Sequence, residues 1–184
     1  MSFTRFKRYK NRNSKKAFKF DKVSWSTAVC VQHARSFALP NMGREGSKQE
    51  RVTSNHIFLM GGCKVEERRV SNQTLELQQN TGFVIKRPNM PFGKFAHGAV
   101  ACCDQIIVTG GISDLMLNMG MRSVPLGDNE CYTFNFYQNQ WRNLPEIPVG
   151  KLHPTLIALG SRYVFQIGGF DDINFDIYRL DMRH

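Results

Sequence analysis

A short apolar run that ends in two glycines occurs three times in this sequence. Residues 57–60, 106–109 and 163–167 form the runs, and the glycine pairs that follow begin at Gly61, Gly110 and Gly168. Self-similarity at a period of about 50 residues is typical of proteins in which each repeat is one small unit that packs against its neighbours. The sequence therefore predicts a stack of similar units.

A second repeated pattern lies between the glycine pairs. Residues 88–94 and 145–151 share the pattern Pro-x-x-Pro-x-Gly-Lys. Upstream of each, apolar-alternating segments flank a short turn, at residues 80–82 in one case and 138–140 in the other. Alignment of the two patterns maps Leu75 onto Tyr132. Alternating segments around a short turn are typical of β-hairpins, so we expect one hairpin before each proline-rich segment.

Each unit is predicted to contain four strands. In the best-formed unit we expect strands at residues 98–101, 106–109 and 131–136, and a fourth that begins near Trp141. Residues 106–109 are apolar at consecutive positions, which is typical of a strand buried on both faces. The glycine pair would end this strand where backbones crowd or where φ must be positive. No segment shows a convincing 3.6-residue apolar period, so the fold class is predicted to be all-β.

These units resemble the kelch repeat, in which a strand ending in Gly-Gly is followed by an aromatic residue and then a tryptophan. The residues that carry the resemblance are Gly61, Gly62, Gly110, Gly111, Tyr132, Trp141, Gly168 and Gly169. The copy at residues 35–91 has Leu75 and Phe83 near the aromatic positions, and the last copy has Tyr178 but no tryptophan after it. Residues 17–25 look like a strand, a turn and a strand opening at Trp25. The resemblance implies a β-propeller of four-stranded antiparallel blades; the competing WD40 family is disfavoured because the chain has no Trp-Asp pair.

The number of predicted strands is too small for a closed propeller. Two whole blades plus an incomplete blade at each end are expected in residues 21–184, whereas propellers usually have about four to eight blades. We therefore predict a partial kelch-type β-propeller whose end blades expose apolar faces. Such faces usually meet a partner or aggregate, so further blades would come from a longer chain or from another subunit.

The N-terminal segment, residues 1–20, carries most of the net charge of +10. It holds eight of the 25 basic residues and none of the 15 acidic ones, so residues 21–184 are nearly neutral. The basic residues of this arm are Arg5, Lys7, Arg8, Lys10, Arg12, Lys15, Lys16 and Lys19. Such an arm suits an anionic partner, either nucleic acid, an acidic protein or an acidic surface. It could also be an organellar presequence, or a disordered arm that only solubilises the chain.

The resemblance implies that partners bind the rim formed by the loops after the glycine pairs and by the connections between blades. The charged residues predicted there are Lys64, Arg68, Arg69, Lys94, Asp114, Arg122, Lys151, Asp171 and Asp172. Variable loops on a fixed scaffold often carry function, but loop charges can equally be solvated and without a role. The methionine-rich loop at residues 111–124 is either an adaptable binding surface or a buried segment.

No catalytic, metal or cofactor pattern is recognised. The five cysteines lack the paired spacing of a zinc site and are expected to be reduced and mostly buried, as in an intracellular protein. His33, His97 and His153 recur near the start of a predicted strand without acidic or cysteine partners at ligand spacing. The sequence has no apolar run long enough to span a membrane and no signal-peptide core, so we expect an intracellular, cytoplasmic protein.

The sequence thus favours a non-catalytic protein–protein interaction module, a scaffold or adaptor that binds through the rim. One alternative is a nucleic-acid or ribonucleoprotein-associated subunit held by residues 1–20. Another is the substrate-recognition part of a ubiquitin ligase, a role common in the kelch family. An enzyme on a kelch-type propeller is a further possibility, but the ligands of a copper site are not found in this sequence.

Overall fold

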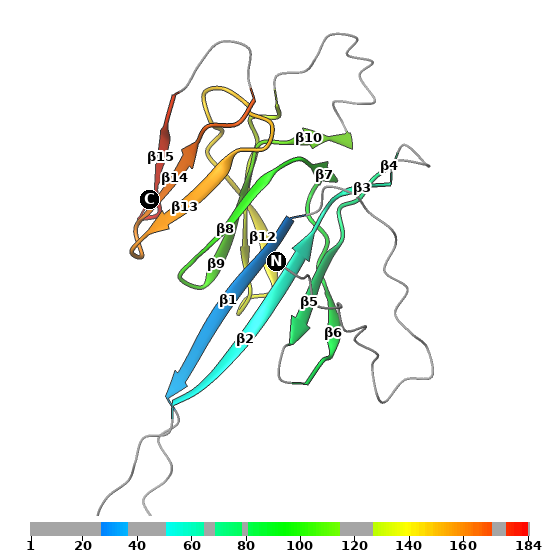
Figure 1. The fold of residues 1–184 in the computed structure, drawn as a ribbon, viewed down its shortest axis with the longest axis vertical. Helices are drawn as coiled ribbons and strands as arrows, with labels where there is room; N and C mark the ends of the chain where they lie inside the picture. Colours follow the sequence, from blue (N-terminus) through cyan, green and yellow to red (C-terminus); the bar gives the residue numbers. More distant parts are fainter. Residues whose placement is uncertain are drawn as a thin grey trace, which may run out of the picture.

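The computed structural model describes residues 27–36, 51–64, 69–78, 81–114, 127–170 and 176–183. The elements with described bounds are all strands, shown in Figure 1. They are β1 (Thr27–Ser36), β2 (Arg51–Met60), β3 (Cys63–Lys64), β4 (Arg69–Val70), β5 (Thr74–Gln78), β6 (Val84–Arg87), β7 (Lys94–Phe95), β8 (Gly98–Cys102), β9 (Gln105–Thr109), β10 (Ile112–Ser113), β11 (Cys131–Asn135), β12 (Gln140–Leu144), β13 (Thr155–Leu159), β14 (Tyr163–Ile167) and β15 (Tyr178–Asp181).

The described strands form three larger sheets and two small ones. The first sheet has the order β1-β2-β5-β6, the second β12-β11-β9-β8 and the third β13-β14-β15, and every pairing is antiparallel. The pairs β3-β4 and β7-β10 make the small sheets. The all-β prediction is confirmed, and so are the four strands predicted for the second sheet, with small differences at their ends. The sheets are open, and the description of them as propeller blades stays a prediction.

The predicted hairpins form because alternating residues bury one face while a short turn reverses the chain. In the second sheet, β11 and β12 pair Phe134 with Trp141, and Asn139 in the turn between them has a φ of 54°. Asparagine tolerates this left-handed conformation better than most residues. The hairpin β5-β6 was predicted in the same way and is also confirmed.

The first strand begins earlier than predicted. The sequence predicts a strand that starts near His33, whereas β1 begins at Thr27 and pairs with β2 along its whole length, from Thr27 opposite Met60 to Ser36 opposite Arg51. The strands predicted at residues 17–25 and the arm at 1–20 lie outside the described residues.

The second sheet is buried between the other two. Its residues Ile106, Ile107 and Val108 are consecutive and all 0% exposed, which confirms a strand buried on both faces. Ile106 and Val108 pack with Phe58 of the first sheet, whereas Ile107 packs with Val164 of the third. Fully burying one such side chain contributes about 1.5–3 kcal/mol, so the stacking of sheets is a major source of stability.

The glycine pairs join each unit to the next. The Gly62 amide donates to the Lys94 carbonyl at 2.8 Å, and the Gly111 amide donates to the Lys151 carbonyl at 2.9 Å. A Cβ at Gly110 would lie 2.4 Å from the Lys151 carbonyl oxygen, and Gly110 has a φ of +68°. Both predicted reasons for glycine, a positive φ and backbone crowding, therefore apply. The glycine pair and the Pro-x-x-Pro-x-Gly-Lys segment thus form the same backbone contact at two places in the molecule, called here the first joint (Gly62 and Lys94) and the second joint (Gly111 and Lys151).

Candidate partner-binding site

Lys94 and Lys151, two residues predicted on the rim, are fully buried. The Lys94 ammonium is 2.9 Å from Oδ2 of Asp128, donates to the Glu130 carbonyl at 3.1 Å and lies over the Tyr132 ring, 4.9 Å from its centroid. Burial, followed by a hydrogen bond from the phenol to the Glu130 carboxylate, raises the pKa of Tyr132. A carboxylate, a backbone carbonyl and a ring face thus stabilise one buried charge.

Lys151 repeats this arrangement one unit later. Its ammonium donates to the Asp176 carbonyl at 3.2 Å and lies 5.5 Å from the centroid of Tyr178. Glu130 and Asp176 each stand two positions before the tyrosine that faces the lysine. Both lysines therefore hold the chain together in this structure and do not present their ammonium groups to a partner.

The other predicted rim residues are only partly described. Arg69 is exposed in β4, and Asp114 is half-buried, with its amide donating to the Gly93 carbonyl at 3.1 Å. Arg68, Arg122, Asp171, Asp172 and the side chain of Lys64 lie outside the described part of the chain, as does most of the methionine-rich loop. The prediction of a binding rim therefore stays untested.

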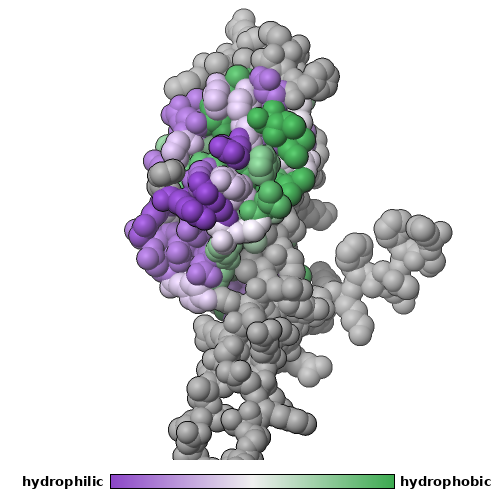
Figure 2. Space-filling view, turned by 90° about the vertical axis from the view of Figure 1, so that its left-hand side faces the viewer, coloured by the Kyte–Doolittle hydropathy of each residue, from purple (hydrophilic) through white to green (hydrophobic). Residues whose placement is uncertain are grey.

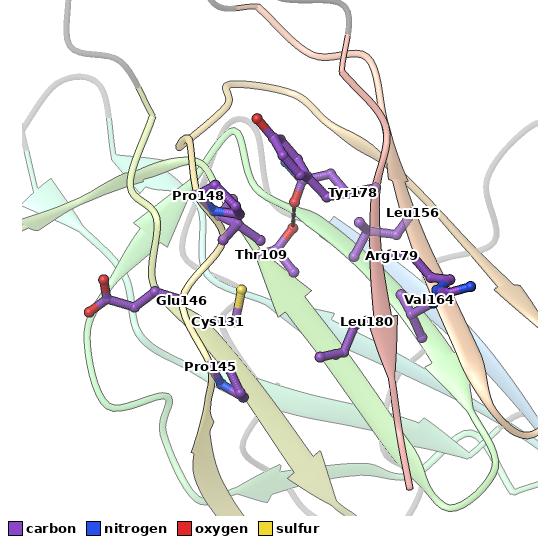
Figure 3. A pocket seen from close by; sticks show the side chains of 12 residues that line it. Thr109, Cys131, Pro145, Glu146, Pro148, Leu156, Val164, Tyr178, Arg179 and Leu180 are labelled. Carbon is purple, nitrogen blue, oxygen red and sulfur yellow. Dashed lines mark hydrogen bonds between the residues drawn. The ribbon is translucent and has the colours of Figure 1, made fainter. Parts of the chain in front are cut away.

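A cavity of about 220 Å³ lies between the second and third sheets, next to β15 (Figure 3). Residues 145–148, which follow β12, form one wall, and Leu180 and Val164 lie on the other side. Leu180 points into the space, whereas the Glu146 carboxylate points away from it. Cys131 also lines the cavity, and burial raises the pKa of its thiol to about 11, so this thiol stays protonated and unreactive at neutral pH.

A hydrogen-bonded polar pair lies among the mainly apolar walls of the cavity. Thr109 and Gln166 both line it, and the Thr109 hydroxyl donates to the Gln166 side-chain oxygen at 2.7 Å. Gln166 is only 3% exposed, and its Nε2 has no hydrogen-bond partner among the described residues. A buried N–H without a partner is costly, so the polar pair at this cavity is not fully satisfied.

The outer face of the third sheet exposes apolar side chains on β13, whereas β15 places Arg179 on the same face, opposite Phe165. In β13 and β14, Ile157 pairs with Phe165 on this face, while Leu156 and Val164 point to the second sheet. Ile157 is 48% exposed, Leu159 62% and Ile177, just before β15, 61%. Figure 2, turned toward this side of the molecule, shows apolar side chains gathered in one patch beside a strongly hydrophilic area.

A charged pair lies at the β15 end of the same face, beside Tyr163. Arg162, in the turn between β13 and β14, donates to both carboxylate oxygens of Asp181 at the end of β15. The hydrogen bond to Asp181 raises the pKa of the Arg162 guanidinium, so Arg162 stays charged throughout the physiological range. The apolar face therefore has a polar border on this side.

Sequence reasoning missed Gln166 and the third-sheet face as features of a site. A signal existed for each. Gln166 interrupts an apolar run at the position where the other two runs carry Leu59 and Val108. Residues 155–167 are apolar at both odd and even positions, so the third sheet has two apolar faces and only one neighbour among the described strands.

The described residues offer no sign of a metal centre. No group of three or more histidine, cysteine, aspartate or glutamate side chains gathers among them. Cys63, Cys102 and Cys131 are buried free thiols, and Cys103 is exposed. In the same part of the chain, no helix is long and apolar enough to cross a membrane.

The sheets and the site define a class of protein, an antiparallel all-β chain of stacked sheets. No family model matches the sequence, and a search of curated proteins finds no match. Function therefore has to be inferred from the residues themselves.

Proposed function

We propose that this chain is a non-catalytic protein-interaction module, a partial kelch-type propeller whose third sheet docks against an apolar β-sheet of another polypeptide. The observation that carries the proposal is the outer face of the third sheet, where Ile157, Leu159 and Ile177 are about half exposed or more. Exposed apolar patches of this kind mark interaction surfaces in folded proteins.

The occupant is proposed to be a β-sheet because the face continues a pattern used twice within the molecule. The first and second sheets meet through Phe58, Ile106 and Phe134, and the second and third through Ile107 and Val164. In each contact, one face of alternating apolar residues packs on another. A further sheet of the same kind would bury the third sheet's outer face, and the repeated units make such a sheet the natural neighbour.

Only some of the charged residues predicted on the rim remain part of this proposal. Arg69 is available to a partner, whereas the buried Lys94 and Lys151 are not. The Arg162–Asp181 pair flanks the apolar face and would lie at the margin of the docked surface, where polar residues are usual.

The test compares variants of the apolar face with a matched control. Ile157→Glu and Leu159→Glu place a charge in the proposed contact, and Tyr137→Glu places the same charge on the equally exposed β11–β12 turn. A photo-crosslinking residue at position 177, which is also exposed on this face, should give discrete adducts in native extract, and both face variants should reduce them at least about tenfold, or about 1.4 kcal/mol. The control should keep them.

Two results would overturn the proposal. Adducts that survive both face variants would show that the partner binds elsewhere. Adducts composed of two copies of this chain, together with a doubled mass in solution that the face variants abolish, would assign the face to self-association instead of another polypeptide.

The basic arm supports a second candidate, binding of single-stranded nucleic acid. Its support is the charge asymmetry, because residues 1–20 carry eight basic side chains and no acidic one, together with Phe3, Phe6 and Tyr9 for stacking on bases. Titration of the full chain with a labelled oligouridine at several salt concentrations tests it. Binding that weakens steeply with salt and disappears in a chain lacking residues 1–20 supports it, and binding insensitive to salt contradicts it.

A further inference from the structure

Two neighbouring cysteines stand at the end of β8. Cys102 is the last residue of this strand, and Cys103 is the first residue of the turn to β9. Within a continuous strand, neighbouring side chains point to opposite faces of the sheet. Cys103 has left the strand, with a φ of 54°. Its thiol is therefore not held on the face opposite to that of Cys102.

Both thiols contact the same turn of the third sheet. The Cys102 thiol donates to the Gly160 carbonyl at 3.9 Å, and the Cys103 thiol donates to the Ser161 carbonyl at 3.5 Å. Each carbonyl lies 58 residues after its cysteine, which is also the separation of the glycine pairs in the two sheets. Corresponding turns of the second and third sheets thus stack on each other. The two sulfur atoms lie side by side against one turn.

The backbone of Cys103 is unusual for a cysteine. A left-handed conformation is costly for most residues that carry a side chain, and glycine, asparagine and aspartate adopt it most readily. Two other hairpin turns have Asn139 and Gly160 in this conformation, with φ of 54° and 61°. Cys103 has neither advantage, and strained residues of this kind cluster at functional sites. The thiol therefore explains this residue better than the turn does.

The two thiols differ in their access to solvent. Cys102 is only 3% exposed, whereas Cys103 is exposed. Burial, followed by the neighbouring Cys103 thiol, raises the pKa of Cys102 to about 11, so Cys102 stays a neutral thiol at neutral pH. A reagent from solution therefore meets Cys103 first, with Cys102 held beside it. An accessible thiol next to a second cysteine is common in redox-sensitive sites.

We propose that Cys102 and Cys103 form an oxidation site, at which hydrogen peroxide converts the two thiols into a reversible disulfide. The Cys103 thiolate attacks one peroxide oxygen, the O–O bond breaks, and the hydroxide that leaves takes up the thiol proton, so a sulfenic acid and water form. The Cys102 sulfur then attacks the Cys103 sulfur, and the sulfenic oxygen leaves as a second water with the Cys102 proton. The two sulfur atoms together lose two electrons, which the peroxide gains. This inference is independent of the proposed docking face.

A disulfide between neighbouring residues is strained and is therefore easily reduced. The described residues contain no cis peptide bond, and neighbouring Cα atoms across a trans peptide are about 3.8 Å apart. This spacing is shorter than the usual range of about 4.4–6.8 Å between bridged cysteines, and strained disulfides are the labile ones. Bond formation also removes both S–H donors. The contacts with the Gly160 and Ser161 carbonyls should therefore be lost on oxidation.

The first test measures the mass of the full chain after treatment with hydrogen peroxide. The tryptic peptide at residues 95–122 holds only these two cysteines. It should lose two hydrogen atoms, and reduced glutathione should restore them. Amide resonances of Gly160 and Ser161 should shift on oxidation and return on reduction. An unchanged peptide mass, a disulfide between another pair of cysteines, or oxygen added to Cys103 without a disulfide would overturn the proposal.

The second test assigns the roles of the two thiols with single variants. Cys102→Ser, or Cys102→Ala if the serine variant does not fold, should give at least about tenfold more sulfenic acid trapped by dimedone than the parent, because no second thiol removes it. In Cys103→Ser, residue 102 should not be trapped. Cys63→Ser, the control that removes a buried thiol elsewhere, should still form the disulfide. Trapping at residue 102 in Cys103→Ser, or loss of the disulfide in Cys63→Ser, would contradict the assignment.

Discussion

The contact between the first and second sheets differs from the contact between the second and third in how completely it is filled. The first buries Phe58, Met60 and Phe134, and Trp141 closes its outer side. The second has a cavity of about 220 Å³ at the corresponding place. Both contacts are built on the same register of strands and the same glycine joint. The two contacts therefore differ in their side chains and in a fourth strand, which the third sheet lacks among the described strands. The second contact is the less completely filled of the two.

The two contacts also differ in their polar groups. At the first, Glu76 is buried on the same face as Phe58 and accepts from His56 at 2.5 Å and from Arg87. Arg87 reaches across to Asn139 of the second sheet at 3.3 Å. Each partner in this network is supplied from within the chain. At the second contact, Thr109 and Gln166 bond to each other, but Gln166 Nε2 has no hydrogen-bond partner among the described residues. The polar pair of the second contact is therefore less completely satisfied than this network of the first.

The largest expected effect is the loss of stability when corresponding core residues of the two contacts are truncated to alanine. Phe134→Ala removes a fully buried ring and should lower the free energy of unfolding by about 4 kcal/mol, whereas its counterpart Leu180→Ala should cost about 2 kcal/mol, because Leu180 is half-buried beside an existing cavity. Urea denaturation of both variants measures the two losses. Equal losses would mean that the second contact is as tightly packed as the first.

Acid should destabilise the contact around His97, which lies between the two glycine joints. His97 lies against both Gly61 and Gly111, and burial, with a smaller effect of the nearby Lys94 charge, lowers its pKa from 6.5 to about 4. The unfolded chain then binds a proton that the folded chain resists between pH 6.5 and pH 4, so stability falls as the pH falls through this range, by about 3 kcal/mol in full. The alignment of the proline-rich segments places Pro154, which does not titrate, at the corresponding position.

The acid effect of His97 is measured as a difference. Unfolding free energies of the parent and of His97→Asn at several pH values should converge toward pH 4, because the variant lacks the titrating group. The His97 ring resonance followed by NMR should titrate near pH 4. A midpoint near 6.5, or a constant difference between the two proteins, would contradict the assignment.

The strands and joints were predictable from the sequence because their signals are local. Alternating apolar residues and a short turn define the hairpin around Asn139, and the glycine pairs mark each joint by their neighbours in the chain. The start of β1 at Thr27, before the predicted position near His33, was not predictable, because the length of this strand depends on its pairing with β2, which is distant in the sequence.

The fate of the two lysines shows why site residues are harder to predict than strands. A lysine after a glycine in a loop resembles a solvated charge. Lys94 is buried because the Glu130 carbonyl and the Tyr132 ring, far along the chain, receive its ammonium. The repeat carried a faint signal, since an acidic residue stands two positions before each of the two tyrosines. This signal can be interpreted only in the folded structure, where stacking of the sheets brings each lysine next to its tyrosine.

A smaller effect on the free energy of unfolding is expected when the polar pair of the second contact is replaced by apolar side chains like those of the first. Thr109→Val leaves the Gln166 oxygen unpaired and Gln166→Met leaves the Thr109 hydroxyl unpaired, so each should cost about 1–2 kcal/mol. The double variant, which is apolar like Met60 and Val108, should lie within about 0.5 kcal/mol of the parent, and a double-mutant cycle from denaturant unfolding measures this coupling. Additive losses would show that the two side chains do not depend on each other.

The smallest expected effect concerns the hydrogen bond between Trp141 and the proline-rich segment at the first contact. Trp141→Phe keeps an aromatic ring against Phe134 but removes the indole donor to the Pro88 carbonyl. A neutral hydrogen bond at a half-buried position contributes about 1 kcal/mol, so the variant should lose about that much. Tyr137→Phe on the exposed turn should change the free energy of unfolding by less than about 0.5 kcal/mol. If Trp141→Phe is equally neutral, ring packing alone, without the hydrogen bond to the Pro88 carbonyl, stabilises the first contact.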